Sequence, residues 1–166
     1  MTAEFSVLGI SRLDDHVLLA DAGLAMGMVA AGAQRLVDLR AETSPPRLAV
    51  PVDHFPIADL EPGQDEPILA AARHVLSLAS GGTVVGLYCQ AGLSRTSAVA
   101  IGYLMLGGAS LHAAYDLVQA VRPQARPALE LWRSLEAIEI QLSTAGAVGA
   151  VLPPQPAAEA RGAEPS

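Results

Sequence analysis

The chain has 166 residues, of which 51% are hydrophobic, and a formal net charge of -7 at pH 7. This length suits one domain with a real hydrophobic core. The acidic balance argues against a general affinity for nucleic acid or for anionic membrane surfaces. The sequence has no cationic, apolar start and no run of about 18 to 20 apolar residues, so we expect a cytoplasmic protein without a secretory signal or a membrane span.

The usage of cysteine and histidine excludes several kinds of site. The single cysteine, Cys89, cannot form an internal disulfide, and a paired-cysteine zinc site is excluded. The four histidines are scattered without a repeated metal-ligand spacing, so we predict neither a metal nor a cofactor. A lone cysteine is most often a small buried apolar residue, and its neighbours must decide whether it does chemistry.

The first third of the chain predicts short strands and one helix. Apolar runs at 5–8 and 16–20 indicate two early strands, or a strand and a turn. Asp21 is a possible N-cap for a helix over 22–31 that Gly32 would end.

Two further short strands are predicted before a long loop. The run 36–39 is apolar and fits a buried parallel strand. The run 48–52 reads as another strand, and Pro51 places it at an edge or near its end. A loop rich in proline, aspartate and glycine follows over 53–66.

The middle of the chain carries the clearest helix and strand signals. Pro67 can open a helix whose apolar positions keep helical spacing until the two glycines at 81–82. Residues 83–88 are short, β-branched and uncharged, which predicts a strand that ends at Cys89. Residues 97–106 are almost wholly apolar and predict a helix buried on all sides.

The last third predicts two helices and a tail. Ser110 can cap one helix, which Pro123 stops, and Pro127 can open the last. From Ser143 the composition shifts to alanine, glycine, proline and glutamate, which predicts a domain over 1–142 and a disordered tail over 143–166. Strands that alternate with helices indicate an α/β fold, with a central, mostly parallel sheet flanked by helices.

One stretch between the predicted central strand and the buried helix has the composition of an anion-binding loop. Ligands in such folds bind where a strand ends and the N–H groups of the next helix point outward. The backbone there forms a cradle for a tetrahedral oxyanion. A glycine allows the sharp bend that such a turn requires. The predicted phosphate-binding residues are Gln90, Ala91, Gly92, Leu93, Ser94 and Arg95.

The same loop supplies a nucleophile and a cation. A thiol at a helix N-terminus beside a guanidinium is favoured as the thiolate, which is the nucleophilic form, and Cys89 has this position. Arg95 offers a planar fork of donors that can hold two phosphoryl oxygens, whereas a lysine would supply charge without that geometry.

Together these residues resemble the signature of the cysteine-dependent protein phosphatases, specifically the compact dual-specificity branch, which reads His-Cys-x-x-Gly-x-x-Arg-Ser/Thr. The resemblance extends over most of 5–142. Residues 37–42 resemble the family's strand before the acid loop, 51–60 resemble the acid loop, and Arg122-Pro123 resembles a late turn. The family's histidine is replaced here by Tyr88, so whatever that imidazole contributes is missing or replaced.

The resemblance implies a role for each matching residue. Cys89 would attack phosphorus to give a cysteinyl-phosphate, Arg95 would bind the phosphoryl oxygens, and Thr96 would hydrogen-bond the sulfur. The general acid should be an aspartate on the acid loop about 30 positions upstream of the cysteine. Asp59 fits that spacing, and Asp53 fits a second version of the loop less well. Either aspartate could instead be only a turn-forming or capping residue.

The expected function is hydrolysis of phosphomonoesters in proteins, on phosphotyrosine and with phosphoserine and phosphothreonine as further candidates. A small non-protein phosphate is an alternative substrate, and a weakly active phosphate-binding module is an alternative function. A sulfurtransferase also places a cysteine in an anion-binding loop, but the ending at 94–96 favours phosphate. The partner would be a phosphorylated protein or peptide, and the oligomeric state is open.

Overall fold

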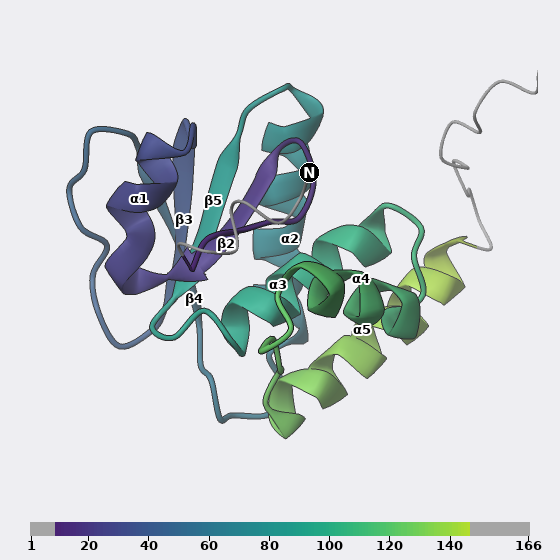
Figure 1. Cartoon of the computed structure of the whole chain (residues 1–166). Helices are drawn as coiled ribbons and strands as arrows, with labels where there is room; N and C mark the ends of the chain where they lie inside the picture. Colours follow the sequence, from purple (N-terminus) through teal and green to yellow (C-terminus); the bar gives the residue numbers. More distant parts are fainter. Residues whose placement is uncertain (1–8, 147–166) are drawn as a thin grey trace, which may run out of the picture.

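A five-stranded sheet forms the centre of the computed structural model, which describes residues 9–146 (Figure 1). The strand order is β1-β2-β5-β3-β4, and β1 alone among these strands is antiparallel to its neighbour. The predicted mostly parallel sheet is therefore confirmed. The strands are β1 (Ser11–Arg12), β2 (Val17–Asp21), β3 (Arg35–Arg40), β4 (Val52–Ile57) and β5 (Val85–Cys89).

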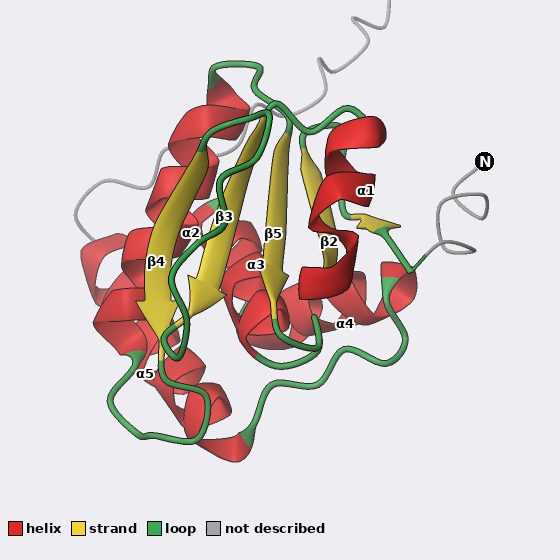
Figure 2. Ribbon diagram, turned by 90° about the vertical axis from the view of Figure 1, so that its left-hand side faces the viewer, coloured by secondary structure: helices red, strands yellow, loops and turns green. Residues whose placement is uncertain are grey.

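Helices cover both faces of the sheet, as predicted. A single short helix lies on one face, and the other four lie on the opposite face (Figure 2). None of the helices in the described part of the chain is long and apolar enough to cross a membrane. The helices are α1 (Ala25–Ala30), α2 (Asp65–Ser80), α3 (Arg95–Leu106), α4 (Leu111–Val121) and α5 (Leu129–Gly146).

The two faces have separate hydrophobic cores. Side chains alternate along a strand, so neighbouring residues of β5 belong to opposite cores. Tyr88 packs with Leu36 and Met28 beneath α1. Cys89 belongs to the larger core, which α2 to α5 cover. The nucleophile candidate and the tyrosine before it therefore point to opposite sides of the sheet.

The predicted central strand and buried helix are both confirmed. Every residue of β5 is buried, and β5 is hydrogen-bonded to β2 on one side and to β3 on the other. The first eight residues of α3, from Arg95 to Gly102, are buried as well. This central position fixes both ends of the loop that joins them.

The predicted strand over 48–52 was wrong, because the strand lies further along the chain. β4 spans Val52–Ile57, and residues 44–51 are irregular. Its polar residues are tolerated because β4 is an edge strand, where one side of the strand meets solvent. Asp53 is paired there with Arg35 and His74, and Phe55 stacks on His74. The edge position that Pro51 predicted is correct.

Several predicted helix ends are confirmed, but α2 begins at Asp65, two residues before Pro67, and α5 begins at Leu129, two residues after Pro127. The side chain of Ser110 accepts a hydrogen bond from the N–H of Ala113, and Gly81 and Gly82 follow the end of α2. Asp21 caps the N–H of Leu24 as a helix cap should, but the turn that it begins is a 3-10 helix over Ala22–Leu24 that leads into α1.

The ends of the domain differ in part from the prediction. The predicted strand at 5–8 lies outside the described residues, whereas the one at 16–20 corresponds to β2. α5 continues to Gly146, past the predicted boundary at 142, and most of the tail predicted over 143–166 lies outside the described residues. Leu135, Ile138 and Leu142 form part of the apolar face of this helix, whereas residues 143–145 are exposed.

Candidate active site

The predicted anion-binding loop joins the end of β5 to the start of α3. Backbone contacts with other segments hold it. The N–H of Ala22 donates to the carbonyl of Gln90 at 3.3 Å, and the N–H of Arg126 donates to the carbonyl of Leu93 at 3.0 Å. The hydroxyl of Ser94 accepts a hydrogen bond from the N–H of Ala128 at 2.9 Å. The structure thus fixes the loop from the segment after β2 and from the α4–α5 connection.

Gly92 makes the bend in this loop possible. Its φ angle is +66°, in the left-handed region that side chains other than glycine rarely adopt. A Cβ atom at this position would lie 2.5 Å from the carbonyl oxygen of Ala20 and 2.8 Å from Nη2 of Arg122. Both the backbone angle and the available space therefore require glycine here.

Arg122 ties the loop to the first described residues of the chain. Its Nε donates to the carbonyl of Gly92 at 2.7 Å, and its Nη1 donates to the carbonyl of Gly9 at 3.0 Å and to Oγ of Ser11 at 3.1 Å. The residue is buried, and this burial lowers the pKa of its guanidinium. The sequence indicated only that Arg122 belongs to a turn that resembles the family's. Its role as a donor could not be predicted, because backbone carbonyls accept hydrogen bonds whatever the side chain of their residue.

Cys89 and Thr96 lie together at the base of the loop. The hydroxyl of Thr96 donates a hydrogen bond to Sγ of Cys89 at 3.0 Å. Thr96 is fully buried and Cys89 is 2% exposed. The sulfur therefore has a fixed donor in a site from which bulk water is largely excluded, as the family resemblance implied for these two residues.

Contacts from the loop after β3 and from the end of β4 hold the guanidinium of Arg95. Its Nη1 and Nη2 donate to the two carboxylate oxygens of Glu42 at 2.6 and 2.8 Å, and Nη1 also reaches the carbonyl of Ile57 at 3.3 Å. Its buried Nε has no hydrogen-bond partner in the described part of the chain. Nε and the neighbouring Nη2 lie along one edge of the guanidinium, and an edge of this kind can bind an oxyanion with two parallel hydrogen bonds.

Glu42 is a site residue whose role the sequence left unassigned. It lies in the loop after β3, and its side chain is about half exposed. Its hydrogen bonds to Arg95 lower its pKa from 4.5 to about 2, against the opposing effect of burial. The same hydrogen bonds raise the pKa of Arg95, with smaller contributions from the charges of Cys89 and Asp59. Glu42 thus fixes the orientation of Arg95 while it remains ionised.

Asp59 lies on the loop between β4 and α2, within range of the charge of Arg95. Its Oδ1 is buried and lacks a hydrogen-bond partner in the described residues. Gln64 anchors this loop: its side-chain oxygen accepts the N–H of Ala58 at 3.1 Å, and its own N–H donates to Oγ of Ser134 at 3.1 Å. Asp59 therefore has a buried carboxylate oxygen to which no group between residues 9 and 146 is hydrogen-bonded.

Asp53 has a different environment. Its carboxylate accepts hydrogen bonds from Nε and Nη2 of Arg35 at 2.7 and 3.0 Å and contacts Nε2 of His74 at 2.6 Å. In the sheet it pairs with Val37, which pairs with Leu87, so two strand spacings separate Asp53 from β5. The hydrogen bonds to Arg35 lower its pKa, which makes it a poor proton donor. Of the two aspartates, Asp59 is therefore the one whose charge acts on Arg95, whereas Asp53 is held by Arg35 and His74.

Tyr88 takes part in a polar cluster on the α1 face. Its hydroxyl donates to Oδ2 of Asp38 at 2.9 Å, and both residues are fully buried. Arg40 donates to the same carboxylate through Nε at 3.0 Å and Nη2 at 2.8 Å, and it lies 5.4 Å from the centre of the Tyr88 ring. Burial raises the pKa of Tyr88, so its hydroxyl stays protonated and acts as a donor.

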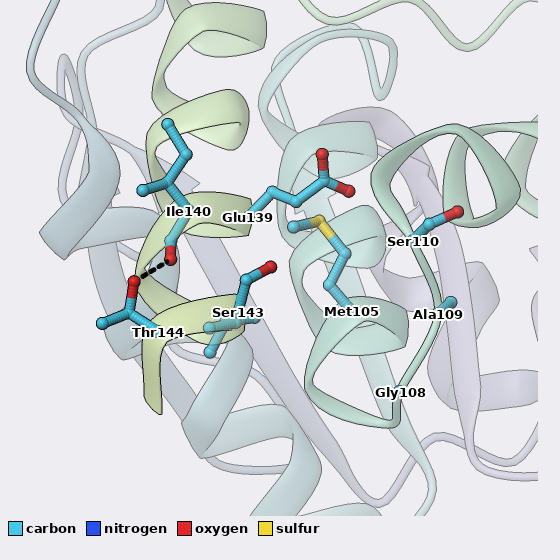
Figure 3. A pocket seen from close by; sticks show the side chains of 9 residues that line it. Met105, Gly108, Ala109, Ser110, Glu139, Ile140, Ser143 and Thr144 are labelled. Atoms are coloured by element: carbon cyan, nitrogen blue, oxygen red, sulfur yellow. Dashed lines mark hydrogen bonds between the residues drawn. The ribbon is translucent and has the colours of Figure 1, made fainter. Parts of the chain in front are cut away.

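A cavity of about 540 Å³ lies elsewhere, between the last turns of α5 and the α3–α4 connection (Figure 3). Its acidic residue, Glu139, accepts the N–H of Leu111 at 2.6 Å and so caps α4. None of the predicted site residues lines this cavity. Within residues 9–146, no group of three or more potential ligands among His, Cys, Asp and Glu could hold a metal ion.

Comparison with known proteins agrees with this geometry. Residues 28–141 match the family described as "Dual specificity phosphatase, catalytic domain". The chain belongs to the dual-specificity phosphatase family. It is 34% identical to dual specificity phosphatase 28 of Mus musculus over 142 residues, which cover 81% of this chain and 82% of the relative. It is 30% identical to dual specificity protein phosphatase 14 of Mus musculus, over 86% of this chain and 75% of the relative.

A solved structure shares the fold. A mouse putative dual specificity phosphatase, solved as a complex with zinc tungstate, superimposes with a TM-score of 0.74 and 26% identity. The similarity covers 89% of this chain and 94% of the other. The sequence-based assignment to the compact dual-specificity branch of the cysteine phosphatases is therefore confirmed.

Proposed function

We propose that this protein hydrolyses phosphomonoesters in proteins through a cysteinyl-phosphate intermediate, with phosphotyrosine as substrate and phosphoserine and phosphothreonine as further substrates. One observation carries the proposal. The guanidinium of Arg95 is held by Glu42, while its buried Nε lacks a hydrogen-bond partner within residues 9–146 and leaves one edge of the group open. That edge suits two oxygens of a phosphoryl group. The loop formed by Gln90, Ala91, Gly92, Leu93 and Ser94 would supply backbone donors.

The first step transfers the phosphoryl group to sulfur. The thiolate of Cys89 attacks phosphorus, the bond from phosphorus to the ester oxygen breaks, and the leaving oxygen takes a proton from the carboxylic acid of Asp59. Arg95 stabilises the charge that spreads over the three remaining oxygens. The product of this step is a cysteinyl-phosphate and a free hydroxyl group on the substrate.

The second step releases phosphate. Water attacks phosphorus, its proton passes to the Asp59 carboxylate, and the bond from phosphorus to sulfur breaks. The hydroxyl of Thr96, 3.0 Å from Sγ, stabilises the thiolate that leaves. The protein is then back in its starting state, with the proton on Asp59 for the next turnover.

The experiment compares wild type with Cys89→Ser, Asp59→Asn and Asp53→Asn on an aryl phosphate and on phosphotyrosine and phosphothreonine peptides. Cys89→Ser should abolish turnover. Asp59→Asn should lower kcat on the peptides by about 100-fold or more, and less on an aryl phosphate with an electron-withdrawing substituent, whose acidic phenol leaves as the anion without a proton. Asp53→Asn serves as the matched control and should keep near wild-type kcat.

Several results would contradict the proposal. Turnover by Cys89→Ser would rule out the covalent intermediate. Peptide binding without turnover by the wild type would indicate a phosphate-binding module, and turnover of small phosphates alone would indicate a non-protein substrate. A loss with Asp53→Asn as large as that with Asp59→Asn would reject Asp59 as the acid.

A further inference from the structure

The polar cluster of Asp38, Arg40 and Tyr88, here called the clamp, lies on the side of the sheet opposite the nucleophile. Asp38 and Tyr88 are paired across β3 and β5, and both are fully buried. Asp38 accepts four hydrogen bonds: from the hydroxyl of Tyr88, from Nε and Nη2 of Arg40, and from the backbone N–H of Arg40. A buried carboxylate with this many donors has one well-defined position.

The clamp holds Arg40 in one orientation. Two of its three guanidinium nitrogens bind Asp38, its side chain is 14% exposed, and its guanidinium lies 5.4 Å from the centre of the Tyr88 ring. Ordering the long Arg40 side chain loses conformational entropy. This loss is the main one in the cluster, because the sheet already orders Asp38 and Tyr88. The side chain of Arg40, the last residue of β3, is therefore held in one conformation.

The third nitrogen of Arg40 reaches the segment from Cys89 to Arg95 that joins β5 to α3, here called the phosphate loop. Nη1 lies 3.4 Å from Oε1 of Gln90, the residue directly after Cys89. The backbone carbonyl of Gln90 is held from the other side by the N–H of Ala22 at 3.3 Å. The loop is thus supported by β3 on one side of Gln90 and by the segment after β2 on the other.

We propose that Arg40 and Tyr88 are positioning residues, which set the backbone of the phosphate loop through Gln90 and through the end of β5. This inference rests on the proposed phosphatase function. Tyr88 occupies the position of the family's histidine, and here its hydroxyl is committed to Asp38 rather than to the loop. The clamp therefore supports the loop from the α1 layer, which the nucleophile does not face.

The test uses two conservative variants and a matched control. Tyr88→Phe removes only the hydroxyl that Asp38 accepts. Arg40→Lys keeps a charge for Asp38 but cannot hold Asp38 with two nitrogens and reach Gln90 with a third. Tyr103→Phe is the control, because Tyr103 also donates to a carboxylate, Asp14, at 2.7 Å, but outside the phosphate loop.

Two readouts separate a positioning role from a purely structural one. The first is kcat/KM on an aryl phosphate. The second is protection of Cys89 from alkylation by inorganic phosphate, which requires no turnover. Each variant should lower kcat/KM and phosphate affinity by about 10-fold, the loss expected for one hydrogen bond to a charged group. The double variant should lose less than the product of the two single losses, because both act through Asp38.

The urea midpoint is measured in parallel. Tyr103→Phe should shift this midpoint by about as much as Tyr88→Phe does, while it leaves kcat/KM and phosphate affinity at wild-type values. Wild-type kcat/KM and phosphate affinity in both folded clamp variants would overturn the inference, as would equal losses in Tyr103→Phe. If the wild type binds phosphate but shows no turnover, the proposed function fails while the protection assay still decides on the clamp.

Discussion

The hydroxyl of Thr96 donates a hydrogen bond to Sγ of Cys89 at 3.0 Å, with both residues buried. This donor acts most strongly on a sulfur that carries negative charge, which is the state of the sulfur when phosphate leaves. Thr96→Val keeps the shape and removes the donor, so we expect the second step to slow by about 100-fold. Rapid-mixing measurements on an aryl phosphate should show a burst of product followed by slow turnover.

Thr96→Ser is the matched control, because it keeps the hydroxyl. It should retain most of the wild-type turnover and show no larger burst than the wild type. A Thr96→Val variant whose burst and steady rates are both unchanged would mean that the sulfur needs no donor in order to leave.

Gly92→Ala should abolish phosphate binding in a protein that is still folded. The added Cβ would lie 2.5 Å from the carbonyl oxygen of Ala20, and the φ angle of +66° adds strain of about 1 kcal/mol. Gly82→Ala is the control, since its φ angle is +85° but nothing lies within 4 Å of its added Cβ. It should cost stability alone. Calorimetric titration with inorganic phosphate compares the two, and equal affinities would contradict the expectation.

Arg122→Met should destabilise the protein strongly. It leaves the carbonyls of Gly92 and Gly9 and the hydroxyl of Ser11 without their buried donor, at a cost of about 3 kcal/mol in the free energy of unfolding. Urea unfolding measures this loss. Arg126→Met is a suitable control, because Arg126 is exposed and its backbone N–H, rather than its side chain, contacts the loop. Similar losses in the two variants would show that the buried hydrogen bonds contribute little.

The Glu42–Arg95 ion pair should make stability depend on acidic pH. Hydrogen bonds from Arg95 lower the pKa of Glu42 from 4.5 to about 2 in the folded state. Its stabilising contribution is therefore complete above pH 4.5 and is lost as the pH falls from 4.5 to about 2. The stability of wild type relative to Glu42→Gln should decline over that interval. Solvent screening at this half-exposed carboxylate keeps the effect small.

Unfolding curves at a series of pH values test this dependence. A constant difference between wild type and Glu42→Gln from pH 5 to pH 2 would contradict it. Glu42→Gln should also weaken phosphate binding near neutral pH, because Arg95 loses the partner that orients it.

The sequence was sufficient to predict the elements that carry the candidate site, since that information is local. β5, the phosphate loop and α3 follow one another directly, and each has a strong signal of its own: β-branched residues, then Cys89 and Gly92, then an apolar run. Spacing favoured Asp59 over Asp53 as the proposed acid, and the structure adds an argument for that choice. Asp53 is already committed to Arg35 and His74, which no local pattern reveals.

What the sequence could not predict depends on contacts between distant residues. β4 was misplaced because its polar residues are stable only at a sheet edge and beside Arg35 and His74. The bond between Tyr88 and Asp38 joins residues 50 positions apart, and that between Arg95 and Glu42 joins residues 53 apart. Such pairs appear only once the sheet order is known.

Arg122 connects residues that are remote along the chain, since it is 113 positions from Gly9 and 30 from Gly92. Closing so large a loop is entropically costly, and such contacts form late in folding. We therefore expect the phosphate loop to reach its final shape only after β1 and the α4–α5 connection have docked. In refolding experiments, the recovery of phosphate binding should lag behind the recovery of helical circular dichroism.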